Sequence, residues 1–323
     1  MSNLCSPFGC ERGFVMGQSV QEMIAQSKGK KNKKIVEKMM PILLFLIATV
    51  SVLTTIGIML TLIVETVTFF TRVSITDFIF GTTWLPFSNR EAQFGILPLI
   101  VGTLKVTLIA IVVAVPIGIS AAIYLSEYAS DNVRRVIKPV LEVLAGIPTI
   151  VYGFFALTFV TPLLQSIFPE IKIFNAISPG IVVGIMIIPM IASLSEDAMS
   201  SVPKSIREGA LAMGSTKFEV AMKITVPAAI SGIVASVVLA VSRAIGETMI
   251  VSLAAGSTPK FDGDFTGSIQ TMTAYIVQVS KGDAGYGTTI YYSIYAVGFT
   301  LFIFTMIMNI LANYVSKRFR EEY

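Results

Sequence analysis

The chain has 323 residues, of which 54% are hydrophobic and only 14% charged, and its formal net charge is +4. Soluble domains rarely combine so much apolar content with so little charge, so the composition favours a membrane-embedded protein. The sequence has no histidine, which removes the commonest general base and the commonest metal ligand. It also has no G-x-x-x-x-G-K-[ST] phosphate loop. We therefore predict that this chain is not an enzyme, does not hydrolyse ATP by itself, and has neither catalytic nor metal-binding residues.

The first element in chain order is a basic tail over residues 1–38, which we expect to be disordered and cytoplasmic. Its two cysteines, Cys5 and Cys10, have no histidine to complete a zinc site, so we interpret them as surplus thiols. The apolar run after the tail is too long for a secretory signal peptide, and no small-residue cleavage site follows it. We therefore expect a retained membrane anchor.

Residues 39–323 contain six apolar stretches that reach or approach the roughly 20 residues a helix needs to cross a bilayer. The predicted spans lie near 41–64, 98–124, 140–165, 179–195, 227–255 and 291–315. Pro116, Pro148 and Pro189 interrupt spans and provide either bends for movement or kinks in static packing. The sequence thus predicts an all-α polytopic membrane protein without a separate soluble domain.

Basic residues are distributed unevenly over the predicted loops. If the tail is inside, the short cytoplasmic segments at 134–138, 204–223 and 317–320 are rich in lysine and arginine, whereas the opposite side has only scattered basic residues. This asymmetry follows the positive-inside rule. It predicts a multi-pass membrane protein with both termini in the cytoplasm.

The cytoplasmic loop 201–226 differs from the others. Residues 204–213 favour a helix, Gly214 ends it, and Ser215 can cap a second helix. Pro227 then opens the fifth span. The loop is predicted to form a helix–turn–helix hairpin, either an amphipathic connector on the membrane surface or a docking element whose small turn residues let another protein approach.

This loop resembles the EAA loop of ABC-transporter permeases through Glu208-Gly209-Ala210, Gly214 and the "ITVP" that ends at Pro227. In that family the loop forms the coupling helix that sits in a groove of the cytoplasmic ATPase. The resemblance implies that the residues coupled to the ATPase are Glu208, Gly209, Ala210, Ala212, Gly214 and Pro227. Gly209 stands where the family more often has alanine, which weakens the helix slightly.

Four further segments resemble the membrane subunits of the phosphate-specific transport system: "FGTTWLPF" (80–87), the run 94–129, "LEVLAGIPTIVYGFFAL" (141–157) and "SRAIGETM" (242–249). The segment "IPMIASLSEDAMSSVP" (188–203) is similar to the C-type subunit of that system rather than to its A-type partner. The resemblance extends from about residue 39 to the C-terminus. It implies the type I ABC-importer permease fold, with six transmembrane helices and a cytoplasmic coupling helix.

The same resemblance implies a function and a set of partners. The chain would pair with an A-type permease, bind a cytoplasmic ATPase dimer that holds ATP and Mg²⁺, and receive inorganic phosphate from an extracytoplasmic binding protein. Alternating access would then move phosphate into the cytoplasm. No cofactor on this chain and no nucleic-acid partner are implied.

Arg243 and Glu247 lie within the fifth predicted span. On one continuous helix their spacing puts Glu247 one turn beyond Arg243 on the same face. Burying an ionised side chain inside the bilayer costs about 2.5–3.5 kcal/mol. The pair is either a structural salt bridge or part of a path for anions. In such a path Arg243 would bind phosphate, and Glu247 would hold the Arg243 side chain in place and compete with phosphate for it. Gly246 would let a partner helix or the anion approach closely.

Other polar residues of the spans leave alternatives open. Lys105 either extends outward to the membrane surface or makes a second anion contact. The hydroxyls of Ser242 and Thr248 either serve as donors to the anion or pack between helices. Glu196 and Asp197 fall where the fourth span leaves the membrane, which favours a solvated or ATPase-facing role.

Two other functions compete with phosphate import. An ABC permease for molybdate, sulfate or phosphonate would share the coupling loop and the arginine. An ATPase-independent secondary anion transporter would lack the docking loop and would typically use an intramembrane carboxylate or histidine relay. A purely structural membrane scaffold would leave Arg243 unexplained.

Overall fold

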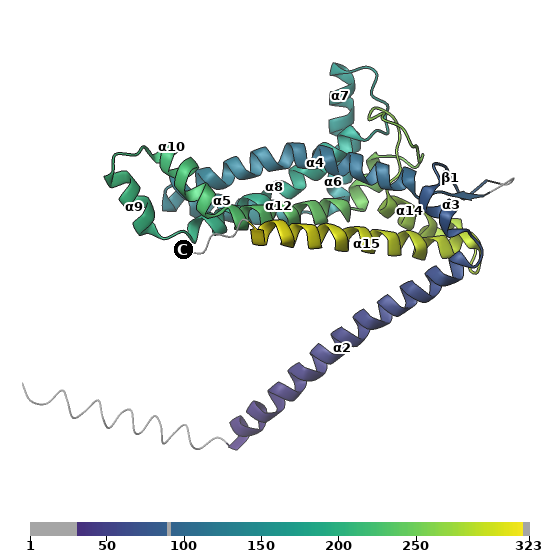
Figure 1. The fold of residues 1–323 in the computed structure, drawn as a ribbon, viewed down its shortest axis with the longest axis horizontal. Coiled ribbons are helices and arrows are strands. Elements are labelled where there is room, and N and C mark those ends of the chain that lie inside the picture. The colour runs from purple at the N-terminus through teal and green to yellow at the C-terminus, as the bar shows by residue number, and fades with distance from the viewer. Residues whose placement is uncertain (1–30, 89–91, 319–323) are drawn as a thin grey trace, which may run out of the picture. The chain divides into compact units, whose positions relative to one another are not determined.

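The computed structural model describes residues 31–88 and 92–318. The predicted tail up to residue 30, with Cys5 and Cys10, lies outside these residues. The described chain is almost entirely helical, with one short antiparallel sheet (Figure 1). It divides into two compact units, Met1–Thr61 and Leu62–Tyr323, which we describe separately.

Helix α2 (Lys31–Phe70) accounts for the described part of the first unit and extends into the second. It begins at Lys31, inside the predicted tail. Its segment Met39–Phe70 is long and apolar enough to cross a membrane. Threonine hydroxyls in this helix donate to backbone carbonyls one turn earlier, as Thr49 does to Phe45 at 2.8 Å. Such bonds satisfy the hydroxyls without water, as a lipid environment requires.

The second unit is a bundle of helices, several of them interrupted. In chain order its elements are α3 (Ile75–Phe80), β1 (Trp84–Leu85), β2 (Gln93–Phe94), α4 (Leu97–Ile123), η1 (Tyr124–Tyr128), α5 (Asp131–Ala145), α6 (Thr149–Phe155), η2 (Ala156–Val160), α7 (Thr161–Ile167), α8 (Ile177–Ser200), α9 (Lys204–Ala212), α10 (Lys217–Val220), η3 (Ala221–Thr225), α11 (Val226–Ala228), α12 (Ile230–Ile245), α13 (Met249–Ala254), α14 (Met272–Gln278), η4 (Val279–Asp283) and α15 (Thr289–Arg318). The η elements are π-helical turns that continue a neighbouring helix.

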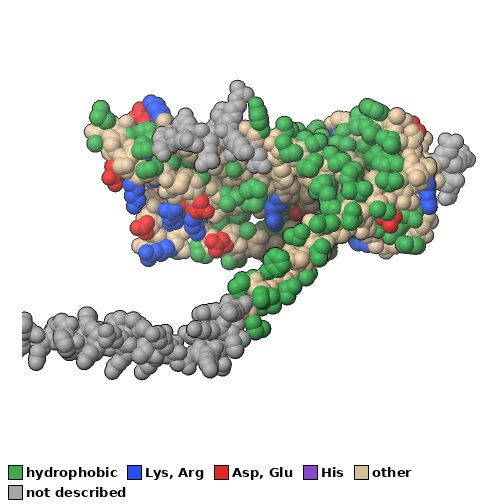
Figure 2. Space-filling view, turned by 60° about the horizontal axis from the view of Figure 1, so that its bottom comes forward, with side chains coloured by type: hydrophobic (Ala, Val, Ile, Leu, Met, Phe, Trp, Pro, Cys, Tyr) green, Lys and Arg blue, Asp and Glu red, His purple; other side chains and the backbone are tan. Residues whose placement is uncertain are grey.

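By length and composition, five helices of the described chain can cross a membrane, or six if one bent pair counts as a single span. That pair is Lys217–Ala228 with Ile230–Ile245, and its two parts meet at 72°. On the face shown in Figure 2, hydrophobic side chains cover much of one half of the helical bundle, and most of the visible Lys, Arg, Asp and Glu side chains lie toward the opposite end.

Two predicted spans are not continuous helices. The span predicted at 140–165 is broken between α5 and α6, where Gly146 and Pro148 interrupt the helix. The span predicted at 227–255 bends before α12 and breaks again between α12 and α13. Pro189, in contrast, lies inside α8 without ending it.

The main core forms where α4, α8 and α12 pack together, with α15 beside α12 (Figure 1). Small residues allow the close approach of α4 and α8, because a Cβ at Gly184 would lie 3.0 Å from the carbonyl oxygen of Ala110. Membrane helices commonly associate through such small residues, since lipid gives no hydrophobic drive for their packing. The buried side chains around this contact include Ala114, Val183 and Ile187.

A second core is aromatic and lies between β1, β2, α3, α14 and the first part of α15. Trp84 packs edge-on against Tyr275 with ring centroids 4.8 Å apart, and against Phe94 at 5.8 Å. Phe69 and Phe78 complete the cluster. The sequence did not reveal this core, because its members come from short, separate segments that show no periodic apolar pattern.

Candidate functional site

Arg243 lies in the last turn of α12, with its side chain exposed in a groove. The groove has a volume of about 370 Å³ and lies between three helices; we call it the Arg243 groove. Its other walls include Leu141 and Glu142 of α5 and Pro189 and Ser193 of α8. Within the described residues, no hydrogen bond or ion pair holds the Arg243 guanidinium. The group is therefore free to bind an anion that enters the groove.

The predicted pairing of Arg243 with Glu247 is wrong for this structure. Helix α12 ends at Ile245 and α13 begins at Met249, so the two charged residues do not share one continuous helical face. The carboxylate of Glu247 instead accepts hydrogen bonds from the backbone N–H groups of Met249 at 3.1 Å and Ile250 at 3.3 Å. Its side chain is only 7% exposed.

Glu247 thus stabilises the start of α13. A negative charge at a helix N-terminus satisfies donors that lack intrahelical partners and interacts favourably with the helix dipole. The hydroxyl of Thr273 also donates to the Glu247 backbone carbonyl at 2.7 Å, which ties this break to α14. Glu247 therefore fixes the break that leaves Arg243 at the end of α12.

Gly246 ends α12 and is exposed. A Cβ there would meet only the carbonyl oxygens of Ser242 at 3.6 Å and Arg243 at 3.8 Å, so packing within this chain does not require a glycine. Ser242 donates to Oδ1 of Asn309 in α15 at 2.6 Å, and Thr248 donates to the Gly246 carbonyl at 3.1 Å. The Ser242 hydroxyl thus links α12 to α15, whereas the Thr248 hydroxyl bonds within the break between α12 and α13.

Lys105 lies far along the chain from the groove residues and is held by another segment. Its ammonium is 3.0 Å from Oδ1 of Asp262, donates to the Asp264 carbonyl at 2.7 Å, and lies 5.4 Å from the ring centroid of Phe265. The hydrogen bond from Lys105 holds the pKa of Asp262 below its usual range. The long side chain thus extends to a polar loop, where its ammonium is buried and two of its three N–H donors are engaged.

The α9–α10 hairpin forms as the loop sequence predicts. Helix α9 ends at Ala212, and Gly214 adopts φ +90°, a conformation that side chains disfavour. The cap of α10 is Thr216 rather than Ser215: its hydroxyl accepts from the Glu219 N–H at 3.3 Å, while the Glu219 carboxylate accepts from the Thr216 N–H at 3.1 Å. This reciprocal capping box fixes the start of the second helix.

The residues that the sequence assigned to ATPase coupling lie on this hairpin and just after it. All are exposed except Ala210, which is half-buried; the exposed ones are Glu208, Gly209, Ala212, Gly214 and Pro227. Pro227 lies in α11, before the bend that leads into α12.

The hairpin also exposes large apolar side chains that the sequence did not single out. Met213 is 88% exposed and Phe218 is 64% exposed. At the base of the hairpin, Arg207 of α9 pairs with Glu127 of η1 at 3.1 Å and also donates to the Met199 carbonyl, while Val220 and Ala221 are buried. The hairpin therefore presents an apolar tip on a base that is bonded to η1 and α8.

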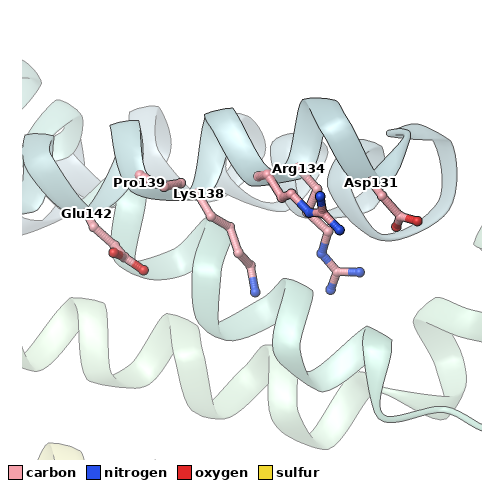
Figure 3. Close-up of a pocket in the computed structure, with 6 residues that line it drawn as sticks. Asp131, Arg134, Lys138, Pro139 and Glu142 are labelled. Atoms are coloured by element: carbon pink, nitrogen blue, oxygen red, sulfur yellow. The ribbon is translucent and has the colours of Figure 1, made fainter.

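Glu196 is not solvated, contrary to the prediction, although Asp197 beside it is exposed. The Glu196 side chain is fully buried and lies against Arg134 and Lys138 of α5, both of which pair with it. Figure 3 shows Arg134 and Lys138 extending from α5 toward the adjacent helix. The Ser200 hydroxyl donates to the Glu196 carboxylate at 2.8 Å, and the Lys138 ammonium also pairs with the Asp197 carboxylate at 2.9 Å. We call these five residues the Glu196 cluster; they hold the first turns of α5 against α8.

Sequence reasoning missed Glu142, which shares the groove with Arg243. The available signal was the Gly146-Ile147-Pro148 sequence, which ends α5 soon after this carboxylate. The predicted interruption of the third span at Pro148 does not by itself show that Glu142 faces the groove. As for metals, the described residues include no group of three or more His, Cys, Asp or Glu side chains placed to hold an ion.

Comparison with known proteins identifies the family. Residues 114–321 match the family described as "Binding-protein-dependent transport system inner membrane component". The chain is 34% identical to the probable ABC transporter permease protein YqgH of Bacillus subtilis, over 76% of this chain and 79% of that protein. It is 33% identical to the phosphate transport system permease protein PstC of Mesorhizobium japonicum, over 75% of this chain and 78% of that protein.

Solved structures agree with this assignment at the level of the fold. An inward-facing structure of the MetNI methionine ABC transporter covers 70% of this chain and 95% of its own, with a TM-score of 0.52 and 16% identity. A bacterial ABC transporter that imports alginate covers 82% of this chain and 96% of its own, with a TM-score of 0.54 and 16% identity. The predicted all-α, type I permease fold is thereby confirmed. The chain belongs to the family of inner membrane components of binding-protein-dependent transport systems.

Proposed function

We propose that this chain is the C-type permease subunit of an ATP-driven importer of inorganic phosphate. The observation that carries the proposal is the Arg243 guanidinium in its groove, which pairs with no other residue that the structure describes, in a chain similar to phosphate permeases over three quarters of its length. Phosphate carries one to two negative charges near neutral pH, and guanidinium offers it a planar set of donors that stays protonated.

Within this proposal each predicted path residue has a distinct part. Arg243 contacts the anion, and Glu247 positions it by fixing the break between α12 and α13. Gly246 leaves the backbone beside the arginine uncovered. Lys105 holds the loop that contains Asp262 and contributes to the path only through that loop.

The proposal includes partners and an orientation. An A-type permease completes the path, an ATPase dimer receives the apolar tip of the α9–α10 hairpin, and a phosphate-binding protein delivers the anion to the opposite side. The ATPase supplies ATP hydrolysis and holds Mg²⁺. The basic segments support a cytoplasmic position of the hairpin and of both termini, because short loops rich in lysine and arginine tend to stay inside.

Transport follows from alternating access of one anion site. Outward opening would let phosphate reach the Arg243 groove from the binding protein, and ATP hydrolysis would open the groove to the cytoplasm. A site of this kind must bind weakly enough to release its substrate. Permeases for molybdate, sulfate or phosphonate have the same requirement, and they are the second candidate.

The test is ATP-dependent uptake into proteoliposomes that hold the whole assembly, with radiolabelled phosphate as cargo and sulfate and molybdate as competitors. We expect uptake that requires ATP and the binding protein and that neither competitor reduces at equal concentration. Uptake of sulfate or molybdate in place of phosphate would contradict the cargo assignment. Uptake without the ATPase would contradict the importer assignment.

A further inference from the structure

Glu142 shares the Arg243 groove, and no role has been assigned to it. Resting on the proposed function, we propose that Glu142 is the counter-charge of Arg243 during transport. After the anion leaves, a movement of α5 brings the Glu142 carboxylate onto the guanidinium, and the next anion displaces it. Glu142 then neutralises Arg243 in the part of the cycle without substrate, and it keeps the anion from being held too tightly.

Glu247, the other acidic residue near Arg243 in the sequence, is already engaged, so Glu142 is the better partner for Arg243. Glu247 is buried, and its carboxylate already accepts two backbone N–H groups of α13. Glu142 is exposed, and within the described residues its side chain has no hydrogen-bond or ion-pair partner. It is the acidic side chain that lines the same groove as Arg243.

Arg243 and Glu142 line the groove from different helices, and no ion pair joins them in this structure. The groove of about 370 Å³ between α5, α8 and α12 leaves room for a small anion with water. A guanidinium inside a membrane bundle is costly unless a counter-charge accompanies it. A carboxylate facing it repels phosphate and so weakens its hold on the arginine. The competing group that a transport path needs is thus placed on a different helix from the arginine.

The helix that bears Glu142 is suited to movement. No residue of α5 is fully buried. Its first turns are held by the Glu196 cluster, and its last turn ends at the break before α6. Helix α6 is fixed against α13, since a Cβ at Gly153 would lie 3.2 Å from the Met249 carbonyl oxygen. Glu142 therefore lies one turn before the break between the lightly packed α5 and the α6 helix that is held against α13. Hinges between moving elements commonly lie at such ends of helices.

The test measures initial ATP-driven phosphate uptake by the reconstituted assembly at increasing phosphate inside the vesicles. The variant is Glu142→Gln, the charge-preserving variant is Glu142→Asp, and the matched control is Glu170→Gln at an exposed carboxylate between α7 and α8. Because a like charge beside the anion is removed, we expect Glu142→Gln to be half-inhibited at about tenfold lower internal phosphate than wild type. Glu142→Asp and the control should match wild type.

A merely structural role would give a different result. Uptake by Glu142→Gln would then fall by the same factor at every internal phosphate concentration, or Glu142→Asp would be as sensitive as Glu142→Gln, and either outcome overturns the proposal. If wild type carries sulfate or molybdate instead of phosphate, the cargo assignment fails. The same comparison with that anion still decides the role of Glu142.

A second measurement tests the proposal even if the Glu142→Gln chain fails to assemble. Carbodiimide labelling of Glu142 in the wild-type assembly, read by mass spectrometry, should rise when phosphate is added, because the anion frees the carboxylate from Arg243. In Arg243→Gln the labelling should not respond to phosphate. Labelling of the wild type that is independent of phosphate would overturn the proposal.

Discussion

The Glu196 cluster gives the sharpest prediction about stability. Replacing Glu196 by glutamine keeps the size of the side chain and removes its charge. The glutamine oxygen can still accept the hydroxyl of Ser200, which now lies 2.8 Å from the carboxylate. Arg134 and Lys138 lose their shared counter-charge, so α5 should detach more readily from α8.

The magnitude follows from the exposure of the partners. Breaking a fully buried ion pair costs about 3–5 kcal/mol, because the remaining charge is left without a partner. Here the side chains of Arg134 and Lys138 are 33% and 29% exposed, so water can solvate part of each charge. Lys138 also keeps Asp197 at 2.9 Å. We therefore expect a loss of about 1–3 kcal/mol, below the fully buried case.

The assay is thermal unfolding of the assembly in lipid nanodiscs, combined with limited trypsin digestion at the basic residues of α5. Glu196→Gln should lower the unfolding midpoint by several degrees and speed cleavage after Arg134. The matched control is Glu219→Gln, where the exposed carboxylate pairs with Lys223 at 3.2 Å and glutamine preserves the capping box. An unfolding midpoint and a cleavage rate equal to those of this control would refute the assigned role of Glu196.

Three further predictions concern other parts of the chain. Gly153→Val places a Cβ 2.8 Å from the Leu253 side chain, so it should destabilise the α6–α13 contact by about 1–3 kcal/mol in thermal unfolding. Gly209→Ala, where a Cβ meets no atom within 4 Å, should not destabilise the protein, and an equal shift of the unfolding midpoint in both variants would contradict this. Met213→Asp should abolish copurification of the ATPase, whereas Tyr286→Asp, equally exposed at the other end, should leave it unchanged. Asp262→Asn should lower the unfolding midpoint only at pH values where wild-type Asp262 is ionised. Because the pKa of Asp262 is lowered in the folded protein, the difference in midpoint between wild type and variant is full above about pH 4. It disappears as the pH falls through the lowered pKa. A difference that persists in stronger acid would contradict it.

Local signals in the sequence were sufficient for the α9–α10 hairpin. Gly214 and the threonine–glutamate spacing act over a few residues, so turn and cap can be recognised without knowing the rest of the fold. Only the identity of the cap was missed, because Ser215 and Thr216 are adjacent residues of similar capping ability and only Thr216 has a glutamate three residues later.

The fifth span shows where such reasoning fails. Its apolar composition is the same whether the helix is continuous or broken, and one of the hydrogen bonds at the break comes from Thr273 in a distant segment. The buried state of Glu196 has the same origin, since its counter-charges come from α5. Ion pairs between distant segments depend on the packing of whole helices, which hydropathy does not encode.

The measurement that tests the central claim most directly compares wild-type, Arg243→Ala and Arg243→Lys chains in ATP-driven phosphate uptake at equal ATPase content. If Arg243 binds the anion in its groove, Arg243→Ala assembles normally and loses uptake. Arg243→Lys would keep a charge without the planar donor set and transport poorly. Normal uptake by Arg243→Ala would show that phosphate is handled elsewhere and would contradict the role assigned to the groove.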